Sequence, residues 1–188
     1  MTTNEPSWKD IKPLISGWSD KQLVGLVQDL YRLSPENVAF LNARLLQHSA
    51  PKQTLTPYKK RIRAAVSPND PWKQDVRLSE GRKAISEFRK ANGNARDTLA
   101  LMTYYVQCGN DHTLEFGDID ERFYDSMCSM VRQIKDRLLK EQDQKLADDI
   151  LPLLEKEFER IDGQMGWGYP DEFGDHVDDL REVFKKET

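Results

Sequence analysis

A group of carboxylates and one imidazole around Gly117 is the first place where this chain could do chemistry. Its members are His112, Glu115, Asp118, Asp120 and Glu121. A divalent cation accepts such oxygen and nitrogen ligands. The spacing, however, matches neither an EF-hand loop nor a zinc-binding helix. Asp118 stands three residues before Glu121, as an N-cap stands before its reciprocal partner. We therefore interpret the group as the start of a long helix and predict no metal site.

A second acidic array follows near the C-terminus. Its members are Asp171, Glu172, Asp175, His176, Asp178, Asp179 and Glu182. On a helical wheel these side chains lie opposite the apolar residues Phe173, Val177 and Leu180. An exposed face of an amphipathic helix has this pattern, so we expect the acidic residues to be solvated rather than catalytic.

The loop before this array carries two large rings among glycines, Trp167 and Tyr169. Rings in this position could line a ligand pocket or a partner surface. Alternatively, Trp167 pins the loop to the core while the glycines let the backbone turn. We expect the anchoring role, and we keep a ligand pocket lined by Trp167 and Tyr169 as the alternative.

Recognised catalytic and cofactor-binding patterns do not occur in the sequence. It contains no Gly-x-Ser-x-Gly nucleophile elbow, no glycine-rich phosphate loop and no Cys near a His in a catalytic pattern. Cys108 and Cys128 both fall in apolar helical patterns, where we expect them to be reduced core residues. We therefore expect no cofactor and assign no catalytic residue, which favours a protein that is not an enzyme.

The distribution of charge along the chain is more informative than the formal net charge of −4. Residues 1–51 carry five basic and five acidic side chains, residues 52–96 carry twelve and four, and residues 97–188 carry eleven and twenty-three. The middle part is therefore strongly cationic and the last part strongly anionic. Clustered cations attract polyanions, so the middle part is the first candidate for a binding surface.

Helical spacing would gather the cations of this middle part on one side of two consecutive helices. The side chains concerned are Lys59, Lys60, Arg61, Arg63, Arg82, Lys83, Arg89 and Lys90. We interpret them as a contact surface for a polyanion, either nucleic acid or an acidic protein. Tyr58 and Trp72 could then stack on nucleic-acid bases. The alternative is that this surface packs against, or is compensated by, the acidic C-terminal half, because most charge runs are ordinary solvated faces.

Apolar residues recur at helical spacing throughout the chain, and no stretch alternates apolar and polar residues over the length of a strand. Helix start signals occur at Ser19 with Gln22 and at Ser34 with Pro35. We predict an all-α protein, a compact bundle of about eight or nine short amphipathic helices that resembles helical repeats at its N-terminus. The whole chain, residues 1–188, is expected to form one domain, with an N-terminal helical subdomain of residues 1–50 as a further division.

Prolines and glycines set the expected boundaries between these helices. Prolines fill two expected loops, at residues 49–57 and 67–75. Glycines are expected to end the two helices that follow, near Gly93 and near Gly109. A long helix begins after Gly117, and the last helices continue the pattern to the C-terminus.

Several short segments, spread over nearly the whole chain, carry a resemblance to known proteins. They are Ser34-Pro35-Glu36-Asn37, Phe40-Leu41 with Arg44, Tyr58-Lys59-Lys60-Arg61-Ile62, Arg82-Lys83-Ala84-Ile85, Leu101 to Gly109, Gly117 to Met127 and Gly166 to Tyr169. Together they resemble a family of small bacterial helical proteins that is known as a domain of unknown function. The resemblance implies one compact, bacterial, cytoplasmic unit, and it carries no catalytic residue over to this chain.

The sequence as a whole favours a binding protein. No run approaches the roughly 20 consecutive apolar residues of a membrane span, and the first ten residues lack the pattern of a signal peptide. We expect a cytoplasmic, non-enzymatic binding or adaptor protein whose cationic face, residues 52–96, contacts nucleic acid or an acidic protein. The alternative is a metal-dependent or small-ligand-binding enzyme with a site near residues 112–121 and 166–176. The sequence indicates no oligomeric state.

Overall fold

Nine helices make up the parts of the chain that the structure, a computed structural model, describes, which are residues 5–70 and 73–185. They are α1 (Trp8–Ile15), α2 (Asp20–Leu33), α3 (Pro35–Leu45), α4 (Pro51–Val66), α5 (Leu78–Ala91), α6 (Ala95–Phe116), α7 (Glu121–Glu141), α8 (Gln144–Ile161) and α9 (Tyr169–Val183). No strand occurs in these two ranges, which confirms the predicted all-α class.

Capping residues in the local sequence account for the first of these boundaries. The predicted start at Ser19 is confirmed: its hydroxyl accepts a hydrogen bond from the backbone N–H of Gln22, and the Gln22 side chain accepts one from the backbone N–H of Ser19. Ser34 caps α3 through its hydroxyl alone, which accepts a hydrogen bond from the backbone N–H of Asn37, and Pro35 is the first helical residue. Each cap satisfies backbone groups that would otherwise have no partner.

The predicted loop at residues 49–57 is wrong from residue 51 onward. Helix α4 begins at Pro51 and continues through Pro57. A proline inside a helix removes one backbone hydrogen bond. Here, however, Thr54 and Tyr58 are buried on either side of Pro57, and their packing holds the helix together across it.

The predicted end of a helix near Gly109 is also wrong. Helix α6 continues to Phe116 and ends at Gly117, whose φ of 91° lies in the region that favours glycine. A Cβ atom at Gly109 would overlap the side chain of Met127 in α7. Gly109 therefore allows two helices to pack closely, whereas Gly117 provides the end of the helix.

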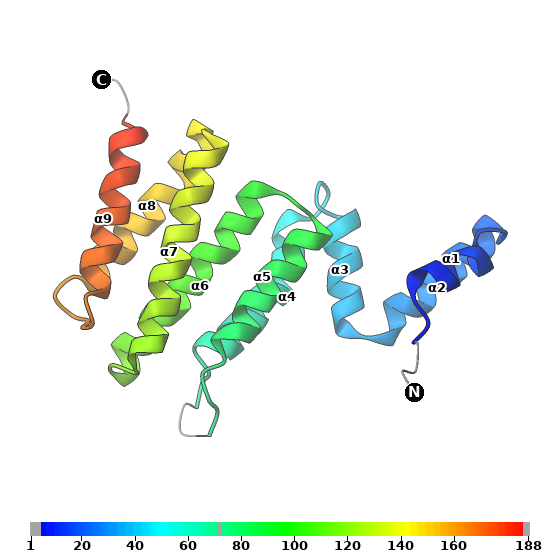
Figure 1. Cartoon of the computed structure of the whole chain (residues 1–188), viewed down its shortest axis with the longest axis horizontal. Coiled ribbons are helices and arrows are strands. Elements are labelled where there is room, and N and C mark those ends of the chain that lie inside the picture. The colour runs from blue at the N-terminus through cyan, green and yellow to red at the C-terminus, as the bar shows by residue number, and fades with distance from the viewer. Residues whose placement is uncertain (1–4, 71–72, 186–188) are drawn as a thin grey trace.

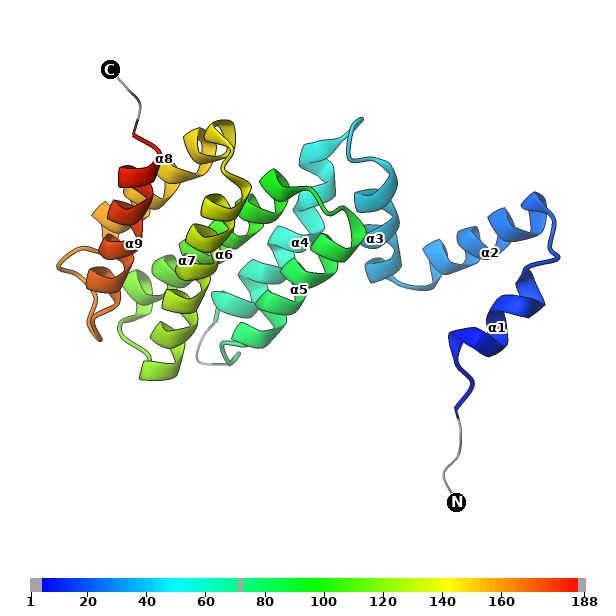
Figure 2. The same ribbon diagram turned by 45° about the horizontal axis from the view of Figure 1, so that its top comes forward.

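The helices from α3 onward stack in two layers (Figures 1 and 2). One layer contains α4, α6 and α8, which pack on one another in that order, and α3 packs on α4 and α5. The other layer contains α5, α7 and α9. Here α7 packs on α9, but α5 and α7 make little direct contact and both rest on α6. Helices α5 and α7 are therefore connected mainly through α6.

Aromatic rings from both layers fill the core between them. The rings of Tyr58, Phe88, Tyr105, Phe123 and Phe173 are each no more than 2% exposed. Burying a side chain of this size contributes about 1.5–3 kcal/mol. The core is one continuous cluster that extends from α3 to the end of α9.

Helices α1 and α2 lie outside this core, and neither buries a residue. They project from the bundle, which they join through α3 (Figure 2). Helix α3 itself buries Ala39 and Ala43 against the bundle. Within the described ranges, no helix has both the length and the apolar character that crossing a membrane requires.

Candidate anion-binding cleft

Two arginines of the predicted cationic face are paired with carboxylates of this chain. Arg61 Nη1 lies 2.6 Å from Glu87 Oε2, and Arg63 Nη1 lies 2.6 Å from Asp111 Oδ2. Asp111 belongs to the acidic C-terminal half of the sequence, whereas Glu87 belongs to the cationic middle part. The charge of Arg63 is therefore compensated by a carboxylate of the acidic C-terminal half, as the alternative interpretation expected.

Lys59 and Arg82 rest against aromatic rings. Lys59 Nζ lies 5.0 Å from the centre of the Tyr104 ring, and Arg82 Cζ lies 5.6 Å from the centre of the Tyr105 ring. Arg82 also donates hydrogen bonds to the carbonyl of Ser126 at 2.6 Å and to its hydroxyl at 3.1 Å. These contacts orient the guanidinium of Arg82 but do not neutralise it.

The assignment of Tyr58 to base stacking is wrong. Its side chain is 1% exposed, and its ring meets Phe88 edge-on with 5.1 Å between the ring centres. The ring is unavailable to a ligand because it fills the core between α4 and α5. Trp72, the other residue assigned to stacking, lies outside the residues that the structure describes.

The remaining four cations of the predicted face have exposed side chains. They are Lys60, Lys83, Arg89 and Lys90. Lys83 Nζ lies 4.0 Å from Glu80 Oε2 on the surface, a contact that contributes little energy. Lys60, Arg89 and Lys90 form no ion pair within residues 5–70 and 73–185. The available positive charge of the predicted face is therefore concentrated on α5.

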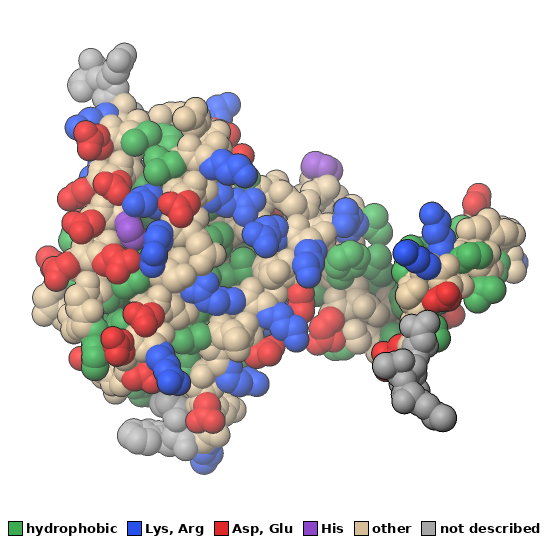
Figure 3. All heavy atoms as spheres, viewed as in Figure 1, with side chains coloured by type: hydrophobic (Ala, Val, Ile, Leu, Met, Phe, Trp, Pro, Cys, Tyr) green, Lys and Arg blue, Asp and Glu red, His purple; other side chains and the backbone are tan. Residues whose placement is uncertain are grey.

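A cleft of about 490 Å³ opens where α5 and α7 diverge over α6. Four cations line it: Arg82 and Arg89 from α5, and Arg137 and Lys140 from α7. The other lining residues are Ile85, Ser86, Thr98, Met102, Met130, Gln133, Asp136 and Glu141. Lys and Arg side chains gather over α5 and the adjoining end of α7 (Figure 3). The cleft thus combines a cationic rim with apolar side chains.

The charge balance of the cleft favours an anion. Its four cations outnumber the two carboxylates, Asp136 and Glu141, and none of the four forms an ion pair in the described parts of the chain. The Nε atom of Arg137 is buried without a hydrogen-bond partner. A buried donor without an acceptor is unfavourable, so the guanidinium of Arg137 is not fully satisfied within the chain.

Our reading of the sequence missed Arg137 and Lys140. Both belong to residues 97–188, whose excess of acidic side chains hides them when charge is counted by segment. Their spacing of three residues places them on the same side of a helix. A count of charge along helical faces could have identified that pair, but not its position opposite α5.

A second cleft, of about 350 Å³, contains Lys59, Lys60 and Arg63 of the predicted face. Two of these three cations are engaged: Arg63 is paired with Asp111, and Lys59 lies over the Tyr104 ring. The cleft between α5 and α7 therefore retains more available positive charge.

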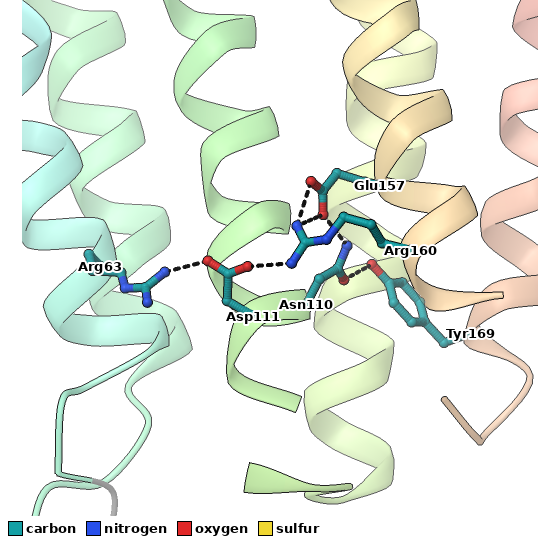
Figure 4. A network of polar contacts seen from close by, with 6 residues as sticks. All are labelled: Arg63, Asn110, Asp111, Glu157, Arg160 and Tyr169. Carbon is teal, nitrogen blue, oxygen red and sulfur yellow. Dashed lines mark hydrogen bonds and ion pairs between the residues drawn. The ribbon is translucent and has the colours of Figure 1, made fainter. Parts of the chain in front are cut away.

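A polar network explains why Arg63 is not available to a ligand (Figure 4). At its centre, the buried carboxylate of Glu157 accepts hydrogen bonds from Arg160 at 2.8 and 2.9 Å and from Asn110 at 3.0 Å. Arg160 also donates to Asp111 at 2.7 Å, and Asp111 accepts a second hydrogen bond from Arg63. The network joins α4, α6 and α8.

The electrostatics of this network favour the charged form of Asp111. Burial alone would raise the pKa of its carboxyl, but hydrogen bonds from Arg160 and Arg63 outweigh burial and hold that pKa below its ordinary value. A carboxyl with a lowered pKa stabilises the folded state above its unfolded pKa, near 4, and this contribution is lost as the pH falls through the folded pKa. The network is therefore fully formed at neutral pH.

The residues around Gly117 do not converge on one point. His112 is buried with its ring 5.0 Å from that of Phe116, and burial lowers its pKa. The N-cap of α7 is Asp120, which accepts a hydrogen bond from the backbone N–H of Phe123 at 2.8 Å. The prediction that Asp118 is the N-cap is therefore wrong. The described residues contain no group of three or more His, Cys, Asp or Glu side chains placed to hold a metal ion.

Asp118 instead accepts a hydrogen bond from the hydroxyl of Tyr124, because α7 begins later than expected. A Cβ atom at Gly166 would lie 3.3 Å from Asp118 Oδ2, so the Gly117 segment and the Trp167 loop are neighbours. Neither of the two clefts described above is lined by residues of these segments.

The two rings of the Trp167 loop have opposite environments. Trp167 is 60% exposed, so the prediction that it pins the loop to the core is wrong. Tyr169 is buried and donates a hydrogen bond from its hydroxyl to Asn110 Oδ1 at 2.9 Å. It is therefore Tyr169 that anchors the loop, through the network around Glu157.

Comparison of the chain with protein-family models, curated proteins and solved structures gives no match. The resemblance to a family of small bacterial helical proteins therefore stays a prediction.

The first prediction concerns Arg160, the cation that compensates buried Glu157. Arg160→Leu should lower the free energy of unfolding by about 3–5 kcal/mol, because it leaves a buried carboxylate without its partner. Arg181→Leu is the matched control, since Arg181 pairs with Glu155 and Asp178 at the surface and should change stability by less than about 1 kcal/mol. Urea denaturation of both variants measures the difference, and equal losses would contradict the central role of Glu157.

The second prediction separates the two rings of the loop. Tyr169→Phe should destabilise the protein by about 1–3 kcal/mol, because Asn110 Oδ1 loses its buried donor. Trp167→Ala should change stability by less than about 0.5 kcal/mol, because the indole is largely exposed. Thermal melts of the two variants test this order. A larger loss of stability in the Trp167 variant than in the Tyr169 variant would show that Trp167 anchors the loop after all.

Proposed function

We propose that this protein is a non-enzymatic binding protein whose cleft between α5 and α7 holds an acidic segment of a partner protein. The observation that supports the proposal is the set of four cations in the cleft, none of them paired with a carboxylate in the described parts of the chain. Of the contact surface predicted within residues 52–96, the proposal keeps the cations of α5 that line the cleft. It adds Arg137 and Lys140 of α7, which line the same cleft.

Arginine suits the recognition of carboxylates. Its planar guanidinium can donate two parallel hydrogen bonds to one carboxylate, which gives direction as well as charge. Three of the four cations in the cleft are arginines. Arg82 is held in place by Ser126 and Tyr105, and Arg137 has a buried donor without an acceptor. At Arg82, an incoming carboxylate would therefore meet a guanidinium that is already partly ordered.

The remaining lining favours an acidic protein over nucleic acid. Asp136 and Glu141 would repel the continuous charge of a phosphate backbone, whereas a peptide can place its carboxylates away from them. Ile85, Met102 and Met130 offer contacts to apolar side chains of a peptide. None of the described lining residues is aromatic, so the cleft lacks the stacking surface on which single-strand binders rely.

The third prediction tests the proposal with a fluorescently labelled peptide rich in glutamate and leucine. Fluorescence anisotropy should report binding that weakens as salt is added, because screening acts on the charge pairs. Arg89→Glu combined with Arg137→Glu should weaken binding at least about tenfold, which corresponds to ~1.4 kcal/mol. Circular dichroism checks that this variant remains folded.

The matched control changes the charge equally at another surface. Lys145→Glu combined with Lys156→Glu alters two exposed side chains of α8 and should leave binding within about twofold. Equal weakening by both double variants would mean that net charge alone attracts the peptide, and this result would overturn the site. Absence of peptide binding at low salt would overturn the proposal. Tighter binding of a single-stranded oligothymidine than of the peptide would replace the acidic protein by nucleic acid.

A further inference from the structure

Helices α1 and α2, residues 8–33, form an arm with a large exposed apolar surface. The most exposed apolar side chains of this N-terminal arm are Trp8, Leu14, Val24 and Leu33, at 64%, 72%, 67% and 74%. Among the described residues, thirteen of the nineteen exposed large apolar side chains lie between residues 8 and 46. Single exposed apolar residues are ordinary on a protein surface, but a concentration of this kind marks an interface.

The apolar residues of α2 have the spacing of a coiled-coil seam. Leu23, Leu26, Leu30 and Leu33 follow one another at intervals of three, four and three residues. Val24, Val27 and Tyr31 widen this apolar stripe to about half of the helix circumference, opposite Gln28 and Arg32. A seam of this kind packs best against another helix.

Within residues 5–70 and 73–185, α3 contacts α2, but no helix buries the apolar stripe of α2. It has 14 residues and buries none of them. Isolated helices of that length are marginal in water, and most helical stability in proteins comes from packing of an apolar face. The capping box at Ser19 helps α2 to begin but covers none of its apolar side chains.

The area available on the arm is sufficient for a stable dimer. The exposed apolar side chains of residues 8–33 amount to roughly 1,000 Å², whereas a standard interface buries about 800 Å² on each partner. The arm therefore exposes enough apolar surface to form one side of a standard interface.

The charge of the arm suits a second copy of this chain as the partner. Residues 8–33 carry four basic and three acidic side chains, so the arm is almost neutral. In an interface between identical surfaces, the net charge of one surface must not repel the same charge on the other. Two nearly neutral arms meet this requirement. A strongly charged partner would gain no attraction from this surface.

We propose that α2 pairs in the antiparallel direction with α2 of a second copy, and that α1 flanks the pair. In this arrangement Leu26 faces Leu30 of the partner helix, and the two helix dipoles oppose each other. The antiparallel direction also places the two bundles at opposite ends of the helix pair, because each bundle follows Leu33 directly. The inference does not depend on the cleft between α5 and α7.

The fourth prediction is that the full chain is a dimer. Sedimentation velocity from about 1 to 100 μM should show a dimer that dissociates on dilution, a range that spans micromolar Kd values. Leu30→Glu should weaken dimerisation about a hundredfold, because each partner would bring a carboxylate into an apolar seam. Leu30 is 43% exposed in the single chain, so the variant should keep the melting temperature of the diluted, monomeric protein.

Two further variants control for charge and direction. Gln28→Glu adds the same charge to the opposite face of α2 and should leave the dimer intact. Leu26→Lys combined with Leu30→Glu should restore the dimer, because antiparallel pairing brings each introduced lysine opposite an introduced glutamate. Parallel pairing would oppose like charges, so a double variant that stays monomeric would overturn the antiparallel arrangement.

The remaining outcomes reject the inference. A chain that is monomeric over the whole concentration range would show that the arm does not bind a second copy. A dimer that survives Leu30→Glu would place the interface on another surface. A dimer that Gln28→Glu disrupts as strongly as Leu30→Glu would mean that charge on the arm, rather than its apolar seam, controls association.

Discussion

The buried carboxylate of Glu157 constrains how the helices of this protein can be arranged. A charge that is 2% exposed must be compensated by nearby donors, and Arg160 and Asn110 provide them. Asn110 in turn accepts a hydrogen bond from Tyr169, where α9 begins. One carboxylate thus fixes the relative positions of α6, α8 and the start of α9. Apolar packing alone would tolerate small shifts of these helices, because it has no preferred direction.

The same network influences where binding can occur. Asp111 pairs with Arg63, so the charge of Arg63 is neutralised and no longer contributes to the predicted cationic face. The same ion pair, together with the pair of Asp111 and Arg160, fixes α4 against α6. These contacts involve the second half of α6, whereas Thr98 and Met102, in its first half, line the cleft. Helices α5 and α7 rest on this fixed helix without packing closely on each other. The position of α6 therefore keeps the cleft open between them.

Local signals in the sequence were sufficient for the fold class but not for the site. The cap at Ser34 could be predicted because it depends on neighbouring residues. The continuation of α4 through Pro57 could not, because burial of Tyr58 by a distant helix decides it. The position of Arg137 opposite α5 likewise depends on how α7 crosses α6. A count of charges along the chain identifies the cationic part of the sequence. Only the tertiary structure shows that Arg63 in this part is paired with Asp111.

Neither the cleft between α5 and α7 nor the N-terminal arm is needed to hold the bundle together. Among the residues that the structure describes, no carboxylate pairs with the cleft cations and the arm buries no residue, so ligands can use both surfaces without competing with the core. A dimer formed through α2 would carry two clefts, one on each bundle. A partner with two acidic segments would then bind the second cleft intramolecularly, and its overall affinity would exceed that of either segment. Association through the arm would thereby strengthen a modest electrostatic site without any new contact in the cleft.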